Sequence, residues 1–163
     1  MNTEIDIKIT DSEWEVMRVV WAKNNVTSKE IIEVLQQKKD WKPATIKTFI
    51  GRIVKKGMLH TESKGKKYIY SANVNEKEFI KSTLDEIFEN ICNKQVGNTI
   101  VDLISKATLS FKDIEKMEKT LELKKRDAVE KVSCNCVPGQ CNCDNHNVYQ
   151  DTCSSEDLNI EKN

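Results

Sequence analysis

The sequence predicts a mainly α protein with one small β-hairpin, followed by a second helical region and a cysteine-rich tail. Three observations lead to this fold class. Near the N-terminus, two threonine-led capping boxes each precede apolar residues at helical spacing. Further along, two short runs of strand-forming residues flank a turn that contains glycine. Finally, four cysteines fall within residues 134–143, in a polar segment that is poor in large apolar groups.

Three helices are expected before the hairpin. The capping box at 10–13 opens a helix near 11–23, and the box at 27–30 opens a helix near 28–38. Pro43 suits the first turn of a third helix, and Gly57 suits its end. Apolar side chains at helical spacing predict the buried stripes of these helices. They are Trp14, Met17, Val20 and Trp21, then Ile31, Ile32, Val34 and Leu35, then Ile46, Phe49, Ile50, Ile53 and Val54.

Two short strands are expected after the third helix. They cover 58–61 and 67–70, and residues 63–65 form the turn between them. Three helices followed by a hairpin are the layout of a winged helix-turn-helix domain. We therefore assign residues 1–72 to a winged-helix DNA-binding domain. The alternative is a small α+β domain that binds nothing.

The charge distribution favours the DNA-binding interpretation. The chain carries 26 basic and 26 acidic residues, yet residues 37–72 carry a net charge of +8 and residues 134–163 a net charge of −4. A basic block in a neutral protein predicts a local contact with a polyanion. A merely solvated basic face is the alternative. The expected DNA-contacting residues are Thr45, Lys47, Thr48, Arg52 and Lys55 on the third helix, and Lys64, Lys66 and Lys67 on the hairpin.

The region from 73 to 132 is expected to form a helical dimerisation domain. Three amphipathic segments follow one another there, and Ser110 is placed to cap the third. Three short helices make a poor core for an isolated unit of this length. Their apolar stripes are therefore expected to close against a second copy of the chain, with packing onto the first domain as the alternative.

The tail, residues 133–163, carries the chemistry. Four cysteines, which we call the hook, follow the pattern C-x-C-x4-C-x-C around Pro138-Gly139, so a tight turn can aim four sulfurs at one point. Thiolates are soft ligands, which predicts Zn(II), Cu(I) or another thiophilic ion. The N-terminus lacks the pattern of a signal peptide, and no apolar run is long enough to span a bilayer. We therefore expect a cytoplasmic protein, where thiols bind metal more often than they form disulfides. The hook consists of Cys134, Cys136, Cys141 and Cys143.

The other histidines and cysteines carry weaker signals. His60 suits a place in the hairpin, and His146 suits a solvent-exposed place in the tail. Cys92 lies in a helical stripe and is expected to be a small buried residue. Cys153 is not required by the metal pattern. A thiol enzyme would need a companion base, and neither histidine lies near an expected pocket, so no enzymatic activity is predicted.

The segment Trp41-Lys42-Pro43-Ala44-Thr45-Ile46-Lys47-Thr48-Phe49-Ile50-Gly51-Arg52-Ile53-Val54-Lys55-Lys56-Gly57 closely resembles the recognition-helix segment of the penicillinase-repressor family. The opening Ser12-Glu13-Trp14-Glu15-Val16-Met17 and Trp21 resemble it too, and the similarity covers roughly residues 7–131. With the hook added, the chain is similar to the copper-responsive, CopY-type branch of that family. One departure is Ala44, which stands where relatives often have a basic residue.

The resemblance implies a homodimer on a pseudopalindromic operator upstream of copper-transport genes. It implies that the zinc form binds DNA and that Cu(I) displaces zinc and releases the operator. The expected partners are double-stranded operator DNA, a second copy of the chain and a copper chaperone that donates Cu(I), with no membrane. Two alternatives stay open. One is a repressor that senses zinc, cadmium or silver. The other is a thiol-based metal carrier or buffer, which leaves the basic block unexplained.

Overall fold

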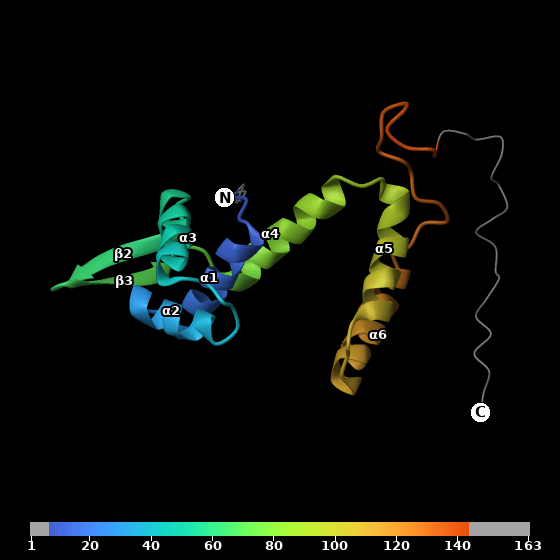
Figure 1. Cartoon of the computed structure of the whole chain (residues 1–163). Coiled ribbons are helices and arrows are strands. Elements are labelled where there is room, and N and C mark those ends of the chain that lie inside the picture. The colour runs from blue at the N-terminus through green and yellow to red at the C-terminus, as the bar shows by residue number, and fades with distance from the viewer. Residues whose placement is uncertain (1–6, 144–163) are drawn as a thin grey trace. The chain divides into compact units, whose positions relative to one another are not determined.

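The computed structural model describes residues 7–143 of the chain and divides it into two compact units, Met1–Asp85 and Glu86–Asn163. Figure 1 shows the elements of each unit in chain order. Within the described residues there are six helices and one small antiparallel sheet, so the predicted fold class is confirmed. The division falls inside α4 (Glu76–Glu89). The three-part division of the chain at 72 and 132 stays a prediction.

The first three helices begin where the local sequence predicts. In α1 (Asp11–Lys23), the Thr10 side chain accepts from the backbone N–H of Glu13, whose carboxylate accepts from the backbone N–H of Thr10. The same reciprocal box, built from Thr27 and Glu30, opens α2 (Ser28–Gln36). α3 (Pro43–Lys55) starts at its proline and is followed by a glycine at φ 75°, a backbone conformation that favours glycine.

The sheet has the order β1-β3-β2, with β1 (Val26–Thr27) and β2 (Leu59–Lys64) each antiparallel to β3 (Lys67–Ala72). We call the β2–β3 hairpin the wing. Because Lys64 pairs with Lys67, the turn is Gly65-Lys66, and its predicted position at 63–65 was wrong. A two-residue turn with a glycine at φ 61° matches the twist of paired strands, so the strands extend further than their apolar pattern indicated.

The core of the first unit lies where α1, α2, α3 and the sheet meet. An aromatic cluster extends it to the start of α4, because Phe79 packs 5.1 Å from Trp14 and 5.9 Å from Trp21 between ring centroids. The Trp21 indole N–H donates to the carbonyl of Val74 at 2.8 Å, which fixes the chain just before α4. The buried apolar residues of this core are Val16, Met17, Val19, Val20, Val26, Ile31, Ile32, Leu35, Ile46, Ile50, Ile53, Met58, Leu59 and Phe79.

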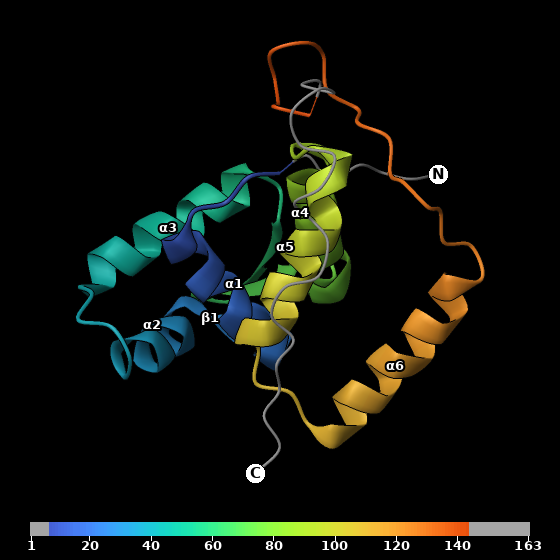
Figure 2. The same cartoon turned by 90° about the vertical axis from the view of Figure 1, so that its right-hand side faces the viewer.

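The second unit contains the end of α4, then α5 (Asn93–Lys106) and α6 (Phe111–Lys125). Ser110 and Asp113 form the capping box of α6, which confirms the predicted cap. Neither α5 nor α6 contains a buried residue, and the two helices diverge from their connecting loop in Figure 2. Along the described part of the chain, no helix has the length and apolar character that crossing a membrane requires.

Candidate DNA interface and metal centre

One face of α3 is buried and the opposite face is open to solvent. Ile46, Ile50 and Ile53 point into the core, and α1 and α2 pack on the same side of the helix (Figure 2). The exposed face carries small residues at Ala44, Thr48 and Gly51, whose chain positions place them along one stripe. Each predicted DNA-contacting side chain is exposed: Thr45, Lys47, Thr48, Arg52, Lys55, Lys64, Lys66 and Lys67.

A groove of about 540 Å³ separates α3 from the wing. Lys47, Gly51 and Lys55 line its α3 side, while Thr61 and the two wing tyrosines line the other. The Thr61 hydroxyl is buried and makes no hydrogen bond with any described residue. Two of the predicted lysines therefore line a groove that also contains the Thr61 hydroxyl. The Thr48 hydroxyl donates to the carbonyl of Ala44 at 3.0 Å.

An ion pair with a buried carboxylate joins the end of α3 to the start of α1. The Lys56 ammonium lies 2.6 Å from the carboxylate of Glu13, which is 1% exposed, and it also donates to the carbonyl of Lys8 at 2.8 Å. Burial alone would raise the pKa of Glu13, but the hydrogen bonds from Lys56 and from the Thr10 backbone N–H lower it overall. The nearby Arg52 guanidinium lowers this pKa further. The ion pair therefore sets the position of the exposed face of α3.

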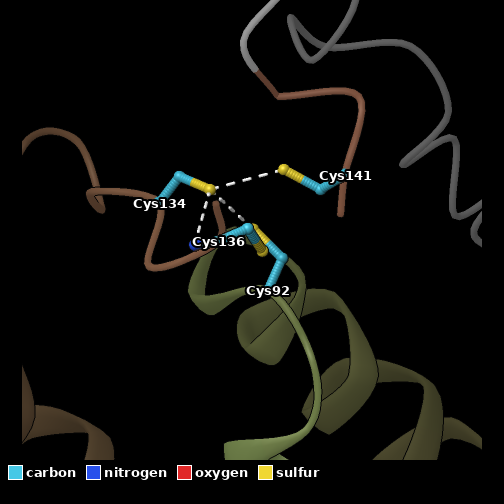
Figure 3. Close-up of side chains that lie close together, drawn as sticks. All are labelled: Cys92, Cys134, Cys136 and Cys141. Atoms are coloured by element: carbon cyan, nitrogen blue, oxygen red, sulfur yellow. Dashed lines mark hydrogen bonds between the residues drawn. The ribbon is translucent and has the colours of Figure 1, made fainter. Parts of the chain in front are cut away.

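Five thiols converge in the second unit. The Sγ atom of Cys134 lies 3.4 Å from that of Cys141 and 3.5 Å from that of Cys92. The Sγ atoms of Cys92 and Cys143 lie 3.3 Å apart. Figure 3 shows the side chains of Cys92, Cys134, Cys136 and Cys141 gathered at one place, with Cys92 on the helical segment and the others on the tail. The sulfurs of these four residues all lie within 4.8 Å of one another.

Backbone hydrogen bonds shape each half of the hook. The N–H of Cys136 donates to the sulfur of Cys134 at 3.3 Å, and the N–H of Cys143 donates to the sulfur of Cys141 at 3.4 Å. Between these pairs, Val137 and Gln140 close the turn, with Gly139 at φ 92°. This repetition explains the C-x-C spacing, since the residue two places after each leading cysteine supplies an N–H to its sulfur.

The pKa values of the clustered thiols are shifted in opposite directions, so some thiols lose their protons more readily than others. A hydrogen bond from the Lys94 backbone N–H lowers the pKa of the Cys92 thiol to about 7, and the N–H of Cys143 lowers that of Cys141. The hydrogen bond shared with Cys92 raises the pKa of the Cys143 thiol to about 12. Adjacent thiolates repel, so without a cation some of the sulfurs keep their protons. A metal ion that binds here must therefore displace protons.

The cysteine cluster fits a thiophilic metal in size and in donor type. A tetrahedral zinc site with Zn–S bonds of about 2.3 Å has sulfurs about 3.8 Å apart. The shortest sulfur–sulfur distances in the cluster are 3.3–3.5 Å, and the sulfurs of Cys92, Cys134, Cys136 and Cys141 all lie within 4.8 Å of one another. These distances bracket the spacing of a zinc site. The donors in the four-residue group are all thiols, which suits Zn(II) and Cu(I) rather than magnesium or calcium.

Comparisons with known proteins identify the family. The model of the family described as "Penicillinase repressor" matches residues 9–123. The MecI methicillin resistance regulatory protein of Staphylococcus aureus is 31% identical over 72% of this chain and 95% of its own length. The chain belongs to the penicillinase repressor family. An uncharacterised 16.5 kDa protein of Latilactobacillus sakei is 45% identical over 84% of this chain and 94% of its own.

The match to this repressor family covers the winged helix and the helices that follow it. The solution structure of the Bacillus licheniformis BlaI monomeric form in complex with the blaP half-operator is 35% identical. It covers 44% of this chain and 87% of its own, with a TM-score of 0.40. The family match ends before the hook begins, so the four tail cysteines lie outside the segment that defines the repressor family. Family members are transcriptional repressors rather than enzymes.

The structure gathers all four predicted hook cysteines and adds Cys92, which sequence reasoning did not place there. Cys92 is buried, as expected, but its sulfur contacts other sulfurs rather than an apolar stripe. No spacing rule could have revealed this, since 42 residues separate it from Cys134. His60 is exposed on β2. His146, Cys153 and the acidic extension that contains them lie outside the described residues.

Proposed function

We propose that this chain is a copper-responsive transcriptional repressor that binds a pseudopalindromic operator as a homodimer. Its cysteine cluster holds Zn(II) in the DNA-binding form, and Cu(I) replaces the zinc and releases the operator. The observation that carries the proposal is the convergence of five thiols in a chain that belongs to a repressor family. Four of the five thiols lie beyond the family segment, which supports metal sensing as a property added to a common DNA-binding body.

The exposed face of α3 supports the DNA-binding part of the proposal. A helix enters the major groove most closely where its side chains are small, as at Ala44, Thr48 and Gly51. Thr45 and Arg52 flank that stripe, Thr45 suited to a base edge and Arg52 to a phosphate. The wing lysines at 64, 66 and 67 extend the same positive surface toward the neighbouring phosphates.

The exposed apolar residues of the second unit support the homodimer. Large side chains on α5 and α6 stay uncovered within one chain, and Phe111 is 89% exposed. A monomeric protein rarely leaves so many large apolar groups open, so we propose that a second copy covers them. The uncovered residues on these two helices are Ile100, Val101, Leu103, Ile104, Phe111, Ile114, Leu121 and Leu123.

The metal switch is geometric rather than electrostatic. One Zn(II) on four thiolates leaves the same net charge as two Cu(I) on those thiolates, so repulsion between the tail and DNA cannot separate the two forms. Zinc favours four sulfurs at the corners of a tetrahedron, whereas Cu(I) accepts two or three sulfurs. The change of metal therefore alters the shape of the cluster. A small change in dimer geometry is enough to misplace two recognition helices on half-sites whose spacing is set by the DNA helical repeat.

Fluorescence anisotropy of a labelled duplex tests the proposal. The duplex carries an operator selected from random sequence by the zinc-loaded full-length protein, and it is titrated anaerobically with Cu(I) and, separately, with excess Zn(II). Release by Cu(I) but not by Zn(II) is the expected result. If cadmium, silver or excess zinc released the duplex more effectively than Cu(I), the protein would be a sensor of that metal. Failure to select any DNA, with tight metal binding intact, would make it a metal carrier.

A matched variant separates sensing from DNA binding. Replacing all four hook cysteines by serine removes most of the sulfur donors and leaves the core of the first unit untouched. This variant should keep the helicity of the native chain by circular dichroism, and its interaction with the operator should no longer respond to Zn(II) or Cu(I). Loss of helicity would instead contradict the separation between a folded DNA-binding unit and a sensing cluster.

A further inference from the structure

Cys92 stands apart from the hook in sequence but joins it in space. It is the N-cap residue of α5 and is 8% exposed. Its sulfur lies within 3.5 Å of the sulfurs of Cys134 and Cys143. A buried thiol whose sulfur contacts two other sulfurs has the position expected of a metal ligand.

A second, independent contact joins the hook to the same helix end. The backbone N–H of Asn93 donates to the side-chain oxygen of Asn135 at 2.9 Å, so the residues that follow Cys92 and Cys134 also bind each other. The first turn of a helix has unpaired N–H groups, which favour negative charge such as that of a thiolate. The hook therefore contacts the start of α5 through the sulfur of Cys92 and through the hydrogen bond between Asn93 and Asn135.

We propose that the tetrathiolate metal site consists of Cys92, Cys134, Cys136 and Cys141, and that Cys143 is the fifth, exchangeable thiol. This inference rests on the proposed function and makes it more specific. The four named sulfurs are the group that lies within 4.8 Å of one another, whereas Cys143 joins the cluster through its contact with Cys92. A tetrahedral zinc ion uses four sulfurs and leaves one, which can replace one of those four when Cu(I) binds, so that each metal form still uses four thiolates.

The added ligand gives the metal a direct connection to the helical unit. A site made only of hook residues closes a short loop within the tail and has no metal–ligand bond to the helices. A site that includes Cys92 ties the tail to the junction between α4 and α5, the helices whose apolar residues are left uncovered. A rearrangement of the cluster then displaces the start of α5, and through it the surface that we assign to the dimer.

The decisive experiment identifies each ligand in the unmutated, full-length protein. The chain is loaded with one equivalent of an NMR-active cadmium isotope, and through-bond correlations from the metal to cysteine β-protons are recorded. The expected result is correlations from Cys92, Cys134, Cys136 and Cys141. Correlations from the four hook cysteines alone would overturn the inference and leave the proposed function intact. The absence of any thiolate-bound cadmium would overturn the proposed function itself.

Two single variants form a matched pair, because each removes one thiol from the same cluster. Cys92→Ala should weaken zinc binding, measured by competition with a chelator, by about tenfold, since Cys143 takes the vacant place without the anchor on α5. Cys143→Ala should leave zinc affinity close to that of the native chain. The reverse order would contradict the assignment. Circular dichroism of both variants shows whether the helices are kept. The cadmium experiment uses the unmutated protein, so it tests the assignment even if a variant fails to fold.

Discussion

The Lys56 ammonium lies 2.6 Å from the carboxylate of Glu13 and so joins the residue after α3 to the first turn of α1. Glu13 is 1% exposed, while the Lys56 side chain is 34% exposed. Glu13 also completes the capping box with Thr10, so one carboxylate both caps α1 and positions α3. A second pair of similar length, Glu15 with Lys38 at 2.8 Å, joins the same helix to a residue just after α2, is more exposed, and offers a comparison.

The first prediction concerns acid stability. Folding lowers the pKa of Glu13 below its ordinary value of 4.5. At a pH between the folded pKa and 4.5, the unfolded chain therefore binds more protons than the folded chain. The stabilisation by Glu13 is thus present above about pH 4.5 and is lost as the pH falls through the folded value. Glu13→Gln should flatten this part of the curve of unfolding free energy against pH, measured by denaturant titration.

Glu13→Gln should also destabilise the protein at neutral pH by about 2 kcal/mol, because it leaves Lys56 without its buried partner. The control is Glu15→Gln, which removes the more exposed ion pairs of Glu15 with Lys38 and Arg18 and should cost less than about 1 kcal/mol. Equal losses for the two variants would show that burial does not distinguish these pairs. The Glu15 pKa is also lowered, chiefly by its hydrogen bond from Lys38, so its variant tests the same pH window.

The second prediction concerns Gly51, an interior glycine of α3. A Cβ atom at this position would meet nothing within 4 Å, so packing within the chain does not require glycine here. Gly51→Ala should therefore stabilise the protein by up to about 1 kcal/mol through helix propensity. It should also weaken operator binding, because the added methyl group projects from the face that we place in the major groove. A variant that is more stable and binds DNA as tightly as before would contradict that placement.

The third prediction assigns Arg52 to a phosphate contact. Arg52→Ala should weaken operator binding and reduce the slope of log affinity against log salt by about 0.9 per lost contact in each protomer. The weakening should be similar for different operator sequences, since a phosphate contact carries no sequence information. Arg18→Ala removes the same charge from α1 in the same unit and should leave the slope nearly unchanged. Equal slope changes would point to the overall charge of the domain instead.

Sequence reasoning succeeded where structure is determined locally. The capping boxes led by Thr10, Thr27 and Ser110 are each complete within four residues, and each opens a helix where predicted. It failed where the structure depends on pairing between strands. β1 has only two residues, too few for an alternating pattern, and it exists because Val26 and Thr27 pair with Tyr70 and Ile69. The exact turn of the wing likewise follows from strand register rather than from composition.

The candidate metal site divides in the same way. The hook cysteines lie close in sequence, and their C-x-C spacing reflects N–H to sulfur bonds within each pair. Cys92 belongs to the cluster only because the chain beyond α6 returns to the start of α5. The repressor family could be inferred from the third helix, because its buried stripe and exposed threonines are both set by residues in one continuous segment.

The last prediction tests whether the switch is geometric. The two metal forms carry the same net charge on the cluster, so release of DNA has to accompany a change of shape in the dimer. Small-angle X-ray scattering of the full-length protein, with zinc and then with Cu(I) at equal protein concentration, should show a change in the pair-distance distribution at constant mass. The variant with serine at the four hook positions should show none. Release of the operator with identical scattering for both metal forms would rule out the geometric mechanism and require a direct contact between the tail and DNA.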